Sequence, residues 1–123
     1  MINAKIYQSI YEELDKYLFA DWKKIVIYLE YGKASYSFSF YVQNDKEYIK
    51  CFDLPGVSDN ELMASFNRID ELVSKERKKE KELWTNMTMI IDSKGNMHSD
   101  FDYTDLSKGT YQYKKNWKNK YLK

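Results

Sequence analysis

The stretches KIVIYLEY, residues 24–31, and SYSFSFYV, residues 35–42, decide the fold. In each, large apolar side chains take alternate positions: Ile25, Ile27, Leu29 and Tyr31 in the first, and Tyr36, Phe38, Phe40 and Val42 in the second. Because successive side chains on a β-strand point to opposite faces, this period of two predicts two strands, each with one apolar face. The short link Gly32-Lys33-Ala34 is typical of a hairpin turn, so we predict that the two strands pair antiparallel.

Three further strands are expected downstream of this hairpin. One spans residues 47–52 and ends before Leu54-Pro55-Gly56, which mark a turn. The stretch WTNMTMIID, residues 84–92, alternates again and places Met87, Met89 and Ile91 on one side. A tight turn at residues 93–96 leads into a fifth strand over residues 97–103.

Three segments have helical spacing. Ile2, Ile6, Ile10, Leu14 and Leu18 recur every four residues and predict an amphipathic helix over residues 2–19. Ser58 and Glu61 have the spacing of a capping box, which predicts that a second helix starts there with Leu62, Phe66, Ile69 and Val73 as its buried stripe. Residues 74–83 are interpreted as its solvated continuation. A terminal helix is expected from about Tyr111, docked through Trp117 and Tyr121.

These elements predict the fold class α+β, in the order α-βββ-α-ββ-α. Strands joined by short turns are antiparallel, so we expect a five-stranded antiparallel sheet with helices on at least one face. The 123 residues suit one domain over residues 1–123.

The bulk charge and the residue counts bound the function. With 20 Lys+Arg against 19 Asp+Glu, the formal net charge is +1, which predicts no bulk attraction to nucleic acid or to an anionic membrane. Cys51 is the single cysteine, so neither a disulfide within the chain nor a cysteine metal cluster can form. No apolar run approaches the ~20 residues of a membrane span, and the chain opens without a signal-like apolar segment, so a cytoplasmic location is expected.

The predicted fifth strand carries the densest polar cluster, in the stretch SDFDYTDL of residues 99–106. Strand alternation places His98, Asp100 and Asp102 on one face, and Asp105 just beyond the strand could join them. The residues from 92 to 105 sum to a charge of −3, whereas six lysines and no acid follow from Lys108. The surface is therefore expected to be electrostatically uneven although the whole chain is near neutral.

Four interpretations of this cluster are open. Three aspartates could bind a hard divalent cation, but strand neighbours diverge and the spacing matches no EF-hand loop. A carboxylate pair for hydrolysis needs a cleft and two separated pKa values, which no pattern supplies. The cluster could be the solvent-facing side of a strand, or an exposed acidic and aromatic patch that binds a partner. Cys51 with His98 gives no nucleophile arrangement, and the four glycines form no phosphate loop, so we expect no enzyme, no catalytic residue and no cofactor.

The same residues carry a resemblance to a known family. The motifs that carry it are Trp84-Thr85, the run from Met87 to Ile91, Gly95, DFDYTDL over residues 100–106, a late NWKNKYL and an early FADWKKIVIYLEY. Together they resemble the YezG-like immunity protein family over essentially the whole chain. The resemblance implies a cytoplasmic antitoxin of Gram-positive bacteria, encoded beside a polymorphic toxin. Such toxins often have LXG-type export regions, leave by type VII secretion and are frequently nucleases. Many members carry an acid where this chain has Thr104, which argues against inhibition by charge mimicry alone.

The resemblance implies that the chain binds a cognate toxin, a nuclease in our expectation, in a tight heterodimer, without metal, nucleic acid or membrane. We predict that Asp100, Asp102, Tyr103 and Asp105 contact that toxin, because carboxylates on a rigid strand suit the basic site of a nuclease. The alternatives are an adaptor or regulatory module with an unrelated protein partner, an orphan immunity copy without a present toxin, and a metal-dependent hydrolase that uses Asp100 or His98.

Overall fold

The computed structural model describes residues 4–32 and 35–123 of the chain. In this part the α-helices are α1 (Ala4–Leu14), α2 (Asp59–Arg77) and α3 (Tyr111–Tyr121). The strands are β1 (Lys24–Tyr31), β2 (Tyr36–Gln43), β3 (Tyr48–Lys50), β4 (Asn86–Asp92) and β5 (Met97–Asp102), and two 3-10 turns, η1 (Asp15–Tyr17) and η2 (Cys51–Asp53), complete the order. The predicted α+β class and the order α-βββ-α-ββ-α are confirmed.

The five strands form one sheet in the spatial order β3-β2-β1-β4-β5, and every neighbouring pair is antiparallel. The central strand β1 pairs Ile27 with Phe40 on one side and with Met89 on the other. These three residues point to the same face, as the alternation predicted. Within the proposed hairpin turn, Lys33 and Ala34 lie outside the described residues, as does Ile2 of the first helical stripe.

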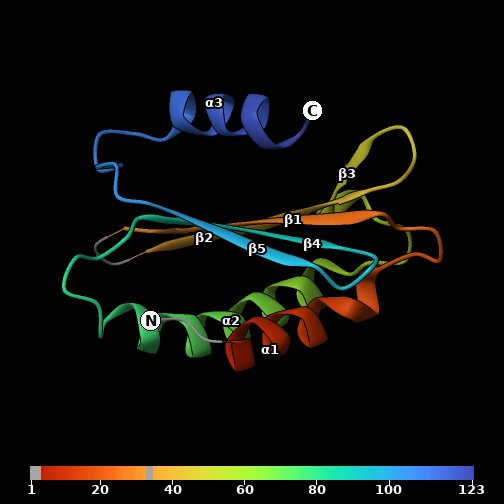
Figure 1. The fold of residues 1–123 in the computed structure, drawn as a ribbon, viewed down its shortest axis with the longest axis horizontal. Coiled ribbons are helices and arrows are strands. Elements are labelled where there is room, and N and C mark those ends of the chain that lie inside the picture. The colour runs from red at the N-terminus through yellow and green to blue at the C-terminus, as the bar shows by residue number, and fades with distance from the viewer. Residues whose placement is uncertain (1–3, 33–34) are drawn as a thin grey trace.

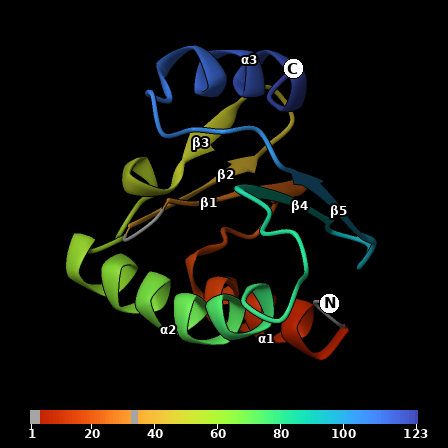
Figure 2. The ribbon, with the colours of Figure 1, turned by 90° about the vertical axis from the view of Figure 1, so that its left-hand side faces the viewer.

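Helices cover both faces of the sheet, whereas the sequence predicted coverage of at least one. Figure 1 shows α1 and α2 on one side and α3 on the other, and the rotated view in Figure 2 agrees. The larger core lies beneath α1 and α2 and includes Ile10, Ile27, Phe40 and Met89. The smaller core, formed by Val26, Tyr28, Tyr41 and Trp117, lies between the sheet and α3. Because helices flank it on both sides, β1 is buried along most of its length.

Ser58 caps the start of α2, which begins where the capping-box spacing predicted. The backbone N–H of Glu61 donates to Oγ of Ser58, at an N–O distance of 3.4 Å. This bond satisfies one of the N–H groups that the first turn of a helix leaves without a partner. The buried stripe of α2 includes the predicted Leu62, Phe66, Ile69 and Val73.

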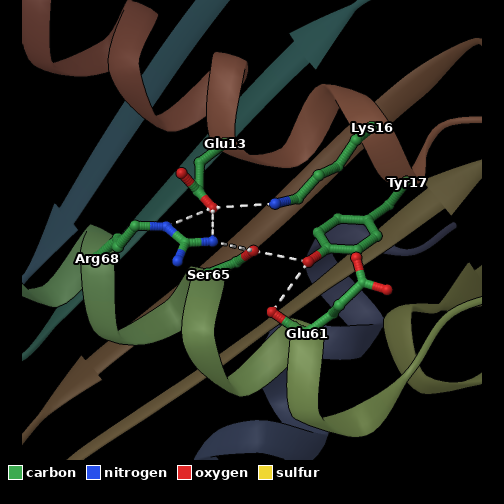
Figure 3. Close-up of polar contacts among 6 residues, drawn as sticks. All are labelled: Glu13, Lys16, Tyr17, Glu61, Ser65 and Arg68. Carbon is green, nitrogen blue, oxygen red and sulfur yellow. Dashed lines mark hydrogen bonds and ion pairs between the residues drawn. The ribbon is translucent and has the colours of Figure 1, made fainter.

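Polar contacts join α1 and its 3-10 extension to α2 (Figure 3). Tyr17 shares a hydrogen bond of 2.6 Å with Oγ of the fully buried Ser65, and its hydroxyl also donates to the backbone oxygen of Glu61 at 3.0 Å. Arg68 donates from Nε to Oε1 of Glu13 at 2.9 Å. This hydrogen bond is the largest cause that lowers the pKa of Glu13 below its usual value.

Among the predicted boundaries that differ, the ends of three elements were wrong by two residues or more. The first helix ends at Leu14, because the chain tightens into η1 and so places the Tyr17 hydroxyl against α2. The third strand ends at Lys50, because η2 turns the chain and buries the side chain of Cys51 completely. The second helix ends at Arg77, and the residues after it are turns and bends.

Arg77 is the reason that the run after Val73 is not a uniformly solvated helix. Its guanidinium lies 5.0 Å from the ring centroid of Tyr31 and 5.5 Å from that of Trp84. Its Nε donates to the backbone oxygen of Trp84 at 2.6 Å. Trp84 is 1% exposed, so its burial draws the chain back toward the sheet after Arg77.

In the described ranges no helix combines the length and the apolar character that a membrane crossing requires.

Candidate protein-binding site

The strand β5 presents its polar side chains to the face that α3 covers. Phe101 points the other way and packs against Trp84, at a centroid distance of 5.5 Å. Asp100 and Asp102 instead line a hollow of about 390 Å³ between β5 and α3. The alternation predicted from the sequence is therefore correct for these residues. The wall of the hollow opposite the strand is formed by Tyr113, Asn116, Lys120 and Tyr121 of α3.

Asp100 is held by one residue of the helix and one of its own strand. The hydroxyl of Tyr121 donates to Oδ2 of Asp100 at 2.7 Å, and Nε2 of His98 lies 2.8 Å from Oδ1. The Tyr121 hydrogen bond is the largest cause that lowers the pKa of the Asp100 carboxyl. Burial, followed by the hydrogen bond to Asp100, raises the pKa of Tyr121 to about 12. At neutral pH the pair is therefore an ionised carboxylate that accepts from a protonated phenol.

Asp102 has a similar arrangement with another tyrosine of α3. Its Oδ2 accepts from the hydroxyl of Tyr113 at 2.8 Å, while its Oδ1 accepts from the backbone N–H and the hydroxyl of Thr104, at 3.0 and 2.7 Å. Burial alone would raise the pKa of Asp102, but the hydrogen bonds from Thr104 and Tyr113 outweigh it and lower the pKa. Burial and the bond to Asp102 raise the pKa of Tyr113. Thr104 thus supports the site locally.

A buried polar chain fixes the middle of α3 to the sheet. The indole Nε1 of Trp117 donates to Oγ1 of Thr88 at 2.8 Å, and Thr88 in turn donates to Oδ1 of Asn86 at 3.1 Å. Asn86 donates to the backbone oxygen of Leu29 at 3.1 Å. The ring of Trp117 meets that of Tyr28 edge-on, at a centroid distance of 5.0 Å. The predicted docking of the terminal helix through Trp117 and Tyr121 is confirmed.

The strand face is therefore only partly solvent-facing: α3 packs over part of it, while the side chain of His98 is 66% exposed and that of Asp100 is 42% exposed. Sequence reasoning missed the roles of Asn86, Thr88 and Tyr113. A signal was present: Asn86 and Thr88 are polar residues on the second face of an otherwise apolar strand, and buried polar groups need partners. Trp117, which donates to Thr88, comes from a helix more than twenty residues downstream, and Asn86 donates to the backbone of Leu29 in β1, so no local pattern identifies either partner.

The structure does not bring all four predicted contact residues onto one face. Tyr103 follows the strand and is 49% exposed. Asp105 is exposed, accepts from the backbone N–H of Ser107 at 2.9 Å, and lines a separate groove of about 1050 Å³ at the end of the sheet, beside Arg77 and Leu106. The expectation that Asp105 joins the strand face was therefore wrong. We call the segment that these four residues span, from β5 into the loop before α3, the acidic and aromatic edge.

Cys51 and His98 do not form a nucleophilic arrangement. Cys51 is fully buried, and burial raises the pKa of its thiol, which disfavours the reactive thiolate. His98 contacts Asp100, on the other face of the sheet from the core that holds Cys51. Within residues 4–32 and 35–123, no group of three histidine, cysteine, aspartate or glutamate side chains is arranged to hold a metal ion.

Comparison with known proteins gives a match over almost the whole chain. A family model described as "Immunity protein YezG-like" matches residues 3–123. The protein named Immunity protein YezG in Bacillus subtilis strain 168 is 26% identical over 110 residues, which cover 82% of this chain and 73% of that protein. Immunity protein YezG of Bacillus spizizenii is 24% identical over 110 residues, covering 82% of this chain and 68% of the relative.

Proposed function

Because the chain belongs to the YezG-like immunity protein family, we propose that it is an antitoxin that binds a cognate toxin and neutralises it in a tight protein complex. The toxin in this proposal is a secreted nuclease exported by a type VII system, and the antitoxin acts in the cytoplasm of the producing Gram-positive cell. The chain itself is a binding protein without catalytic activity. The observation that carries the proposal is the family match over residues 3–123.

The contact surface in this proposal is the acidic and aromatic edge formed by Asp100, Asp102, Tyr103 and Asp105. A nuclease holds phosphates with basic side chains, so carboxylates presented to it raise both the association rate and the specificity. The lowered pKa values of Asp100 and Asp102 keep both carboxyls ionised at neutral pH. Tyr103, 49% exposed, offers the amphipathic ring that interfaces favour.

Preorganisation supports this siting. Asp100 and Asp102 are each hydrogen-bonded to a tyrosine of α3, at 2.7 and 2.8 Å, so their positions are set before a partner arrives. A carboxylate that is already oriented loses less conformational entropy on binding than a mobile one. Because the chain as a whole has a formal charge of only +1, the acidic edge acts locally and needs shape and aromatic contacts beside it.

The experiment is an affinity purification of the tagged chain from its native host, followed by a high-salt wash and mass spectrometry of the bound proteins. The expected result is near-stoichiometric recovery of a large exported protein with a nuclease-like C-terminal domain. An untagged culture is the matched control for adherent proteins. Recovery of unrelated cytoplasmic proteins alone would contradict the proposal and favour an adaptor, and recovery of nothing would leave an orphan immunity copy.

A further inference from the structure

A second hollow lies on the opposite flank of α3 from Asp100 and Asp102. It has a volume of about 210 Å³ and is bounded by β2, by the end of β3 with the 3-10 turn that follows it, and by α3. Lysines reach it from two elements, Lys50 from β3 and Lys114 and Lys118 from α3, and the hydroxyls of Ser37 and Ser39 come from β2. We call this hollow the lysine cleft. Trp117 lines both it and the hollow of Asp100 and Asp102, so α3 separates a surface with two carboxylates and Lys120 from a surface whose charged residues are three lysines.

The lysines of the lysine cleft have no carboxylate partner among residues 4–32 and 35–123. Across the two described ranges, none of Lys50, Lys114 and Lys118 forms an ion pair with a carboxylate. Lys114 lies 5.8 Å from the ring centroid of Tyr28, a contact that leaves its N–H donors available. Ammonium groups gathered around one hollow repel one another, so an anionic group bound between them is favoured. The serine hydroxyls add donors that suit a carboxylate.

An exposed aromatic ring borders these cations. Phe52 is 41% exposed, and its ring lies 6.5 Å from that of Phe66, which anchors its inner side. Aromatic rings beside cationic side chains are typical of the energetically important centres of protein interfaces. An inorganic anion would satisfy the lysines but would leave Phe52 in water. The combination therefore favours a protein segment that carries both carboxylates and an apolar side chain.

Single-stranded nucleic acid is the other polymer that combines negative charge with stacking. Proteins that bind it present successive aromatic faces along a groove. In the lysine cleft, however, Tyr28, Phe38, Tyr41 and Trp117 are each at most 8% exposed, which leaves Phe52 as the accessible ring of the lining. The carboxylates of Asp100 and Asp102 across α3 would also repel a phosphate backbone that extended past the helix.

We propose that the lysine cleft binds a segment of the toxin that carries carboxylates next to an apolar side chain. This inference rests on the proposed function, because the toxin supplies the segment. A toxin seated across α3 then meets carboxylates on the β5 flank and ammonium groups on the β3 flank. Opposite charges on two flanks fix the orientation of a partner, which one patch alone leaves open.

The test compares two charge-reversal variants of equal net charge. In K50E/K118E both substitutions lie in the lysine cleft, whereas in the control K75E/K115E both lie on exposed positions outside it, on α2 and α3. Calorimetric titration with the toxin domain that co-purifies with the chain measures each dissociation constant at low and high salt. We expect K50E/K118E to weaken binding by about tenfold or more and the control by about twofold or less, since close interfacial charges dominate over distant ones. Circular dichroism verifies that both variants fold.

The outcomes separate this inference from the proposed function. Equal dissociation constants for the two variants would overturn the lysine cleft and leave toxin binding intact. A wild-type chain that binds no toxin would refute the proposed function, and the inference with it. The third outcome uses a 12-nucleotide oligothymidylate as the probe. If the wild-type chain binds this oligonucleotide, and K50E/K118E loses that binding but keeps its affinity for the toxin, the lysine cleft belongs to nucleic acid and the proposal is overturned.

Discussion

Replacing Tyr113 with phenylalanine removes one hydroxyl and tests whether the aspartates of β5 hold α3. The Tyr113 hydroxyl donates to Oδ2 of Asp102 at 2.8 Å, whereas the other carboxylate oxygen is served by Thr104. Without that donor, a half-buried charged oxygen must find water at the helix surface. Hydrogen bonds to charged groups contribute about 1.5–3 kcal/mol, and partial exposure of this pair reduces the expected loss to about 1 kcal/mol.

The matched control for this variant is Tyr111→Phe. Tyr111 lies in the same helix but is 80% exposed, so removal of its hydroxyl should change the free energy of unfolding by less than about 0.3 kcal/mol. Urea unfolding followed by circular dichroism gives both values. A double-mutant cycle of Tyr113→Phe with Asp102→Ala should give a coupling energy of about 1 kcal/mol at pH 7.

The pH dependence gives the cycle a second criterion. Because the pKa of Asp102 is lowered in the folded state, its stabilising contribution is complete above the unfolded pKa of about 3.9 and is lost as the pH falls through the lower folded pKa. The cost of Tyr113→Phe should therefore shrink in acid. A loss of equal size in Tyr111→Phe, or a coupling energy near zero at pH 7, would refute the assignment of Asp102 as an anchor of α3.

Three further predictions concern stability. Trp117→Phe should lower the free energy of unfolding by about 2 kcal/mol, because it leaves Thr88 without its indole donor and opens space in the smaller core. Urea titration measures this loss, and an unchanged unfolding midpoint would contradict the packing described. Tyr17→Phe should cost about 1 kcal/mol in the same assay, since it removes a hydrogen bond from the buried Ser65, whereas a neutral result would mean that Ser65 finds another partner. Gly95→Ala should cost about 1 kcal/mol, because Gly95 has a φ of +91°, and a thermal midpoint equal to wild type would show that the turn relaxes.

The sheet was the most predictable part of the molecule. In β2 serines alternate with large apolar residues, so the face that each side chain takes follows from strand geometry alone, whereas in β1 Val26 and Tyr28 on the second face are buried as well. The end of β3 was not predictable, because the burial of Cys51 in a 3-10 turn depends on the core beneath it. The end of α2 was missed for a related reason: the ring contacts of Arg77 require Tyr31 and Trp84 to be in place.

The candidate site was predictable in composition but not in surroundings. Alternation correctly placed Asp100 and Asp102 on one face, yet gave no indication that α3 would return over that face and supply Tyr113 and Tyr121. The opposite flank of the helix escaped notice for the same reason. Lys50 and Lys118 are 68 positions apart in the sequence, and only the packing of α3 over β2 and β3 lets them line one hollow.

The measurement that tests the central claim most directly is inhibition of the purified toxin domain by titration with this chain. If the chain is the cognate antitoxin, the nucleic-acid-cleaving activity should fall in proportion to the chain added and reach background at a small whole-number ratio. Tyr111→Phe, outside the proposed contacts, should follow the same curve. Full toxin activity in the presence of a large excess of folded chain would contradict the account.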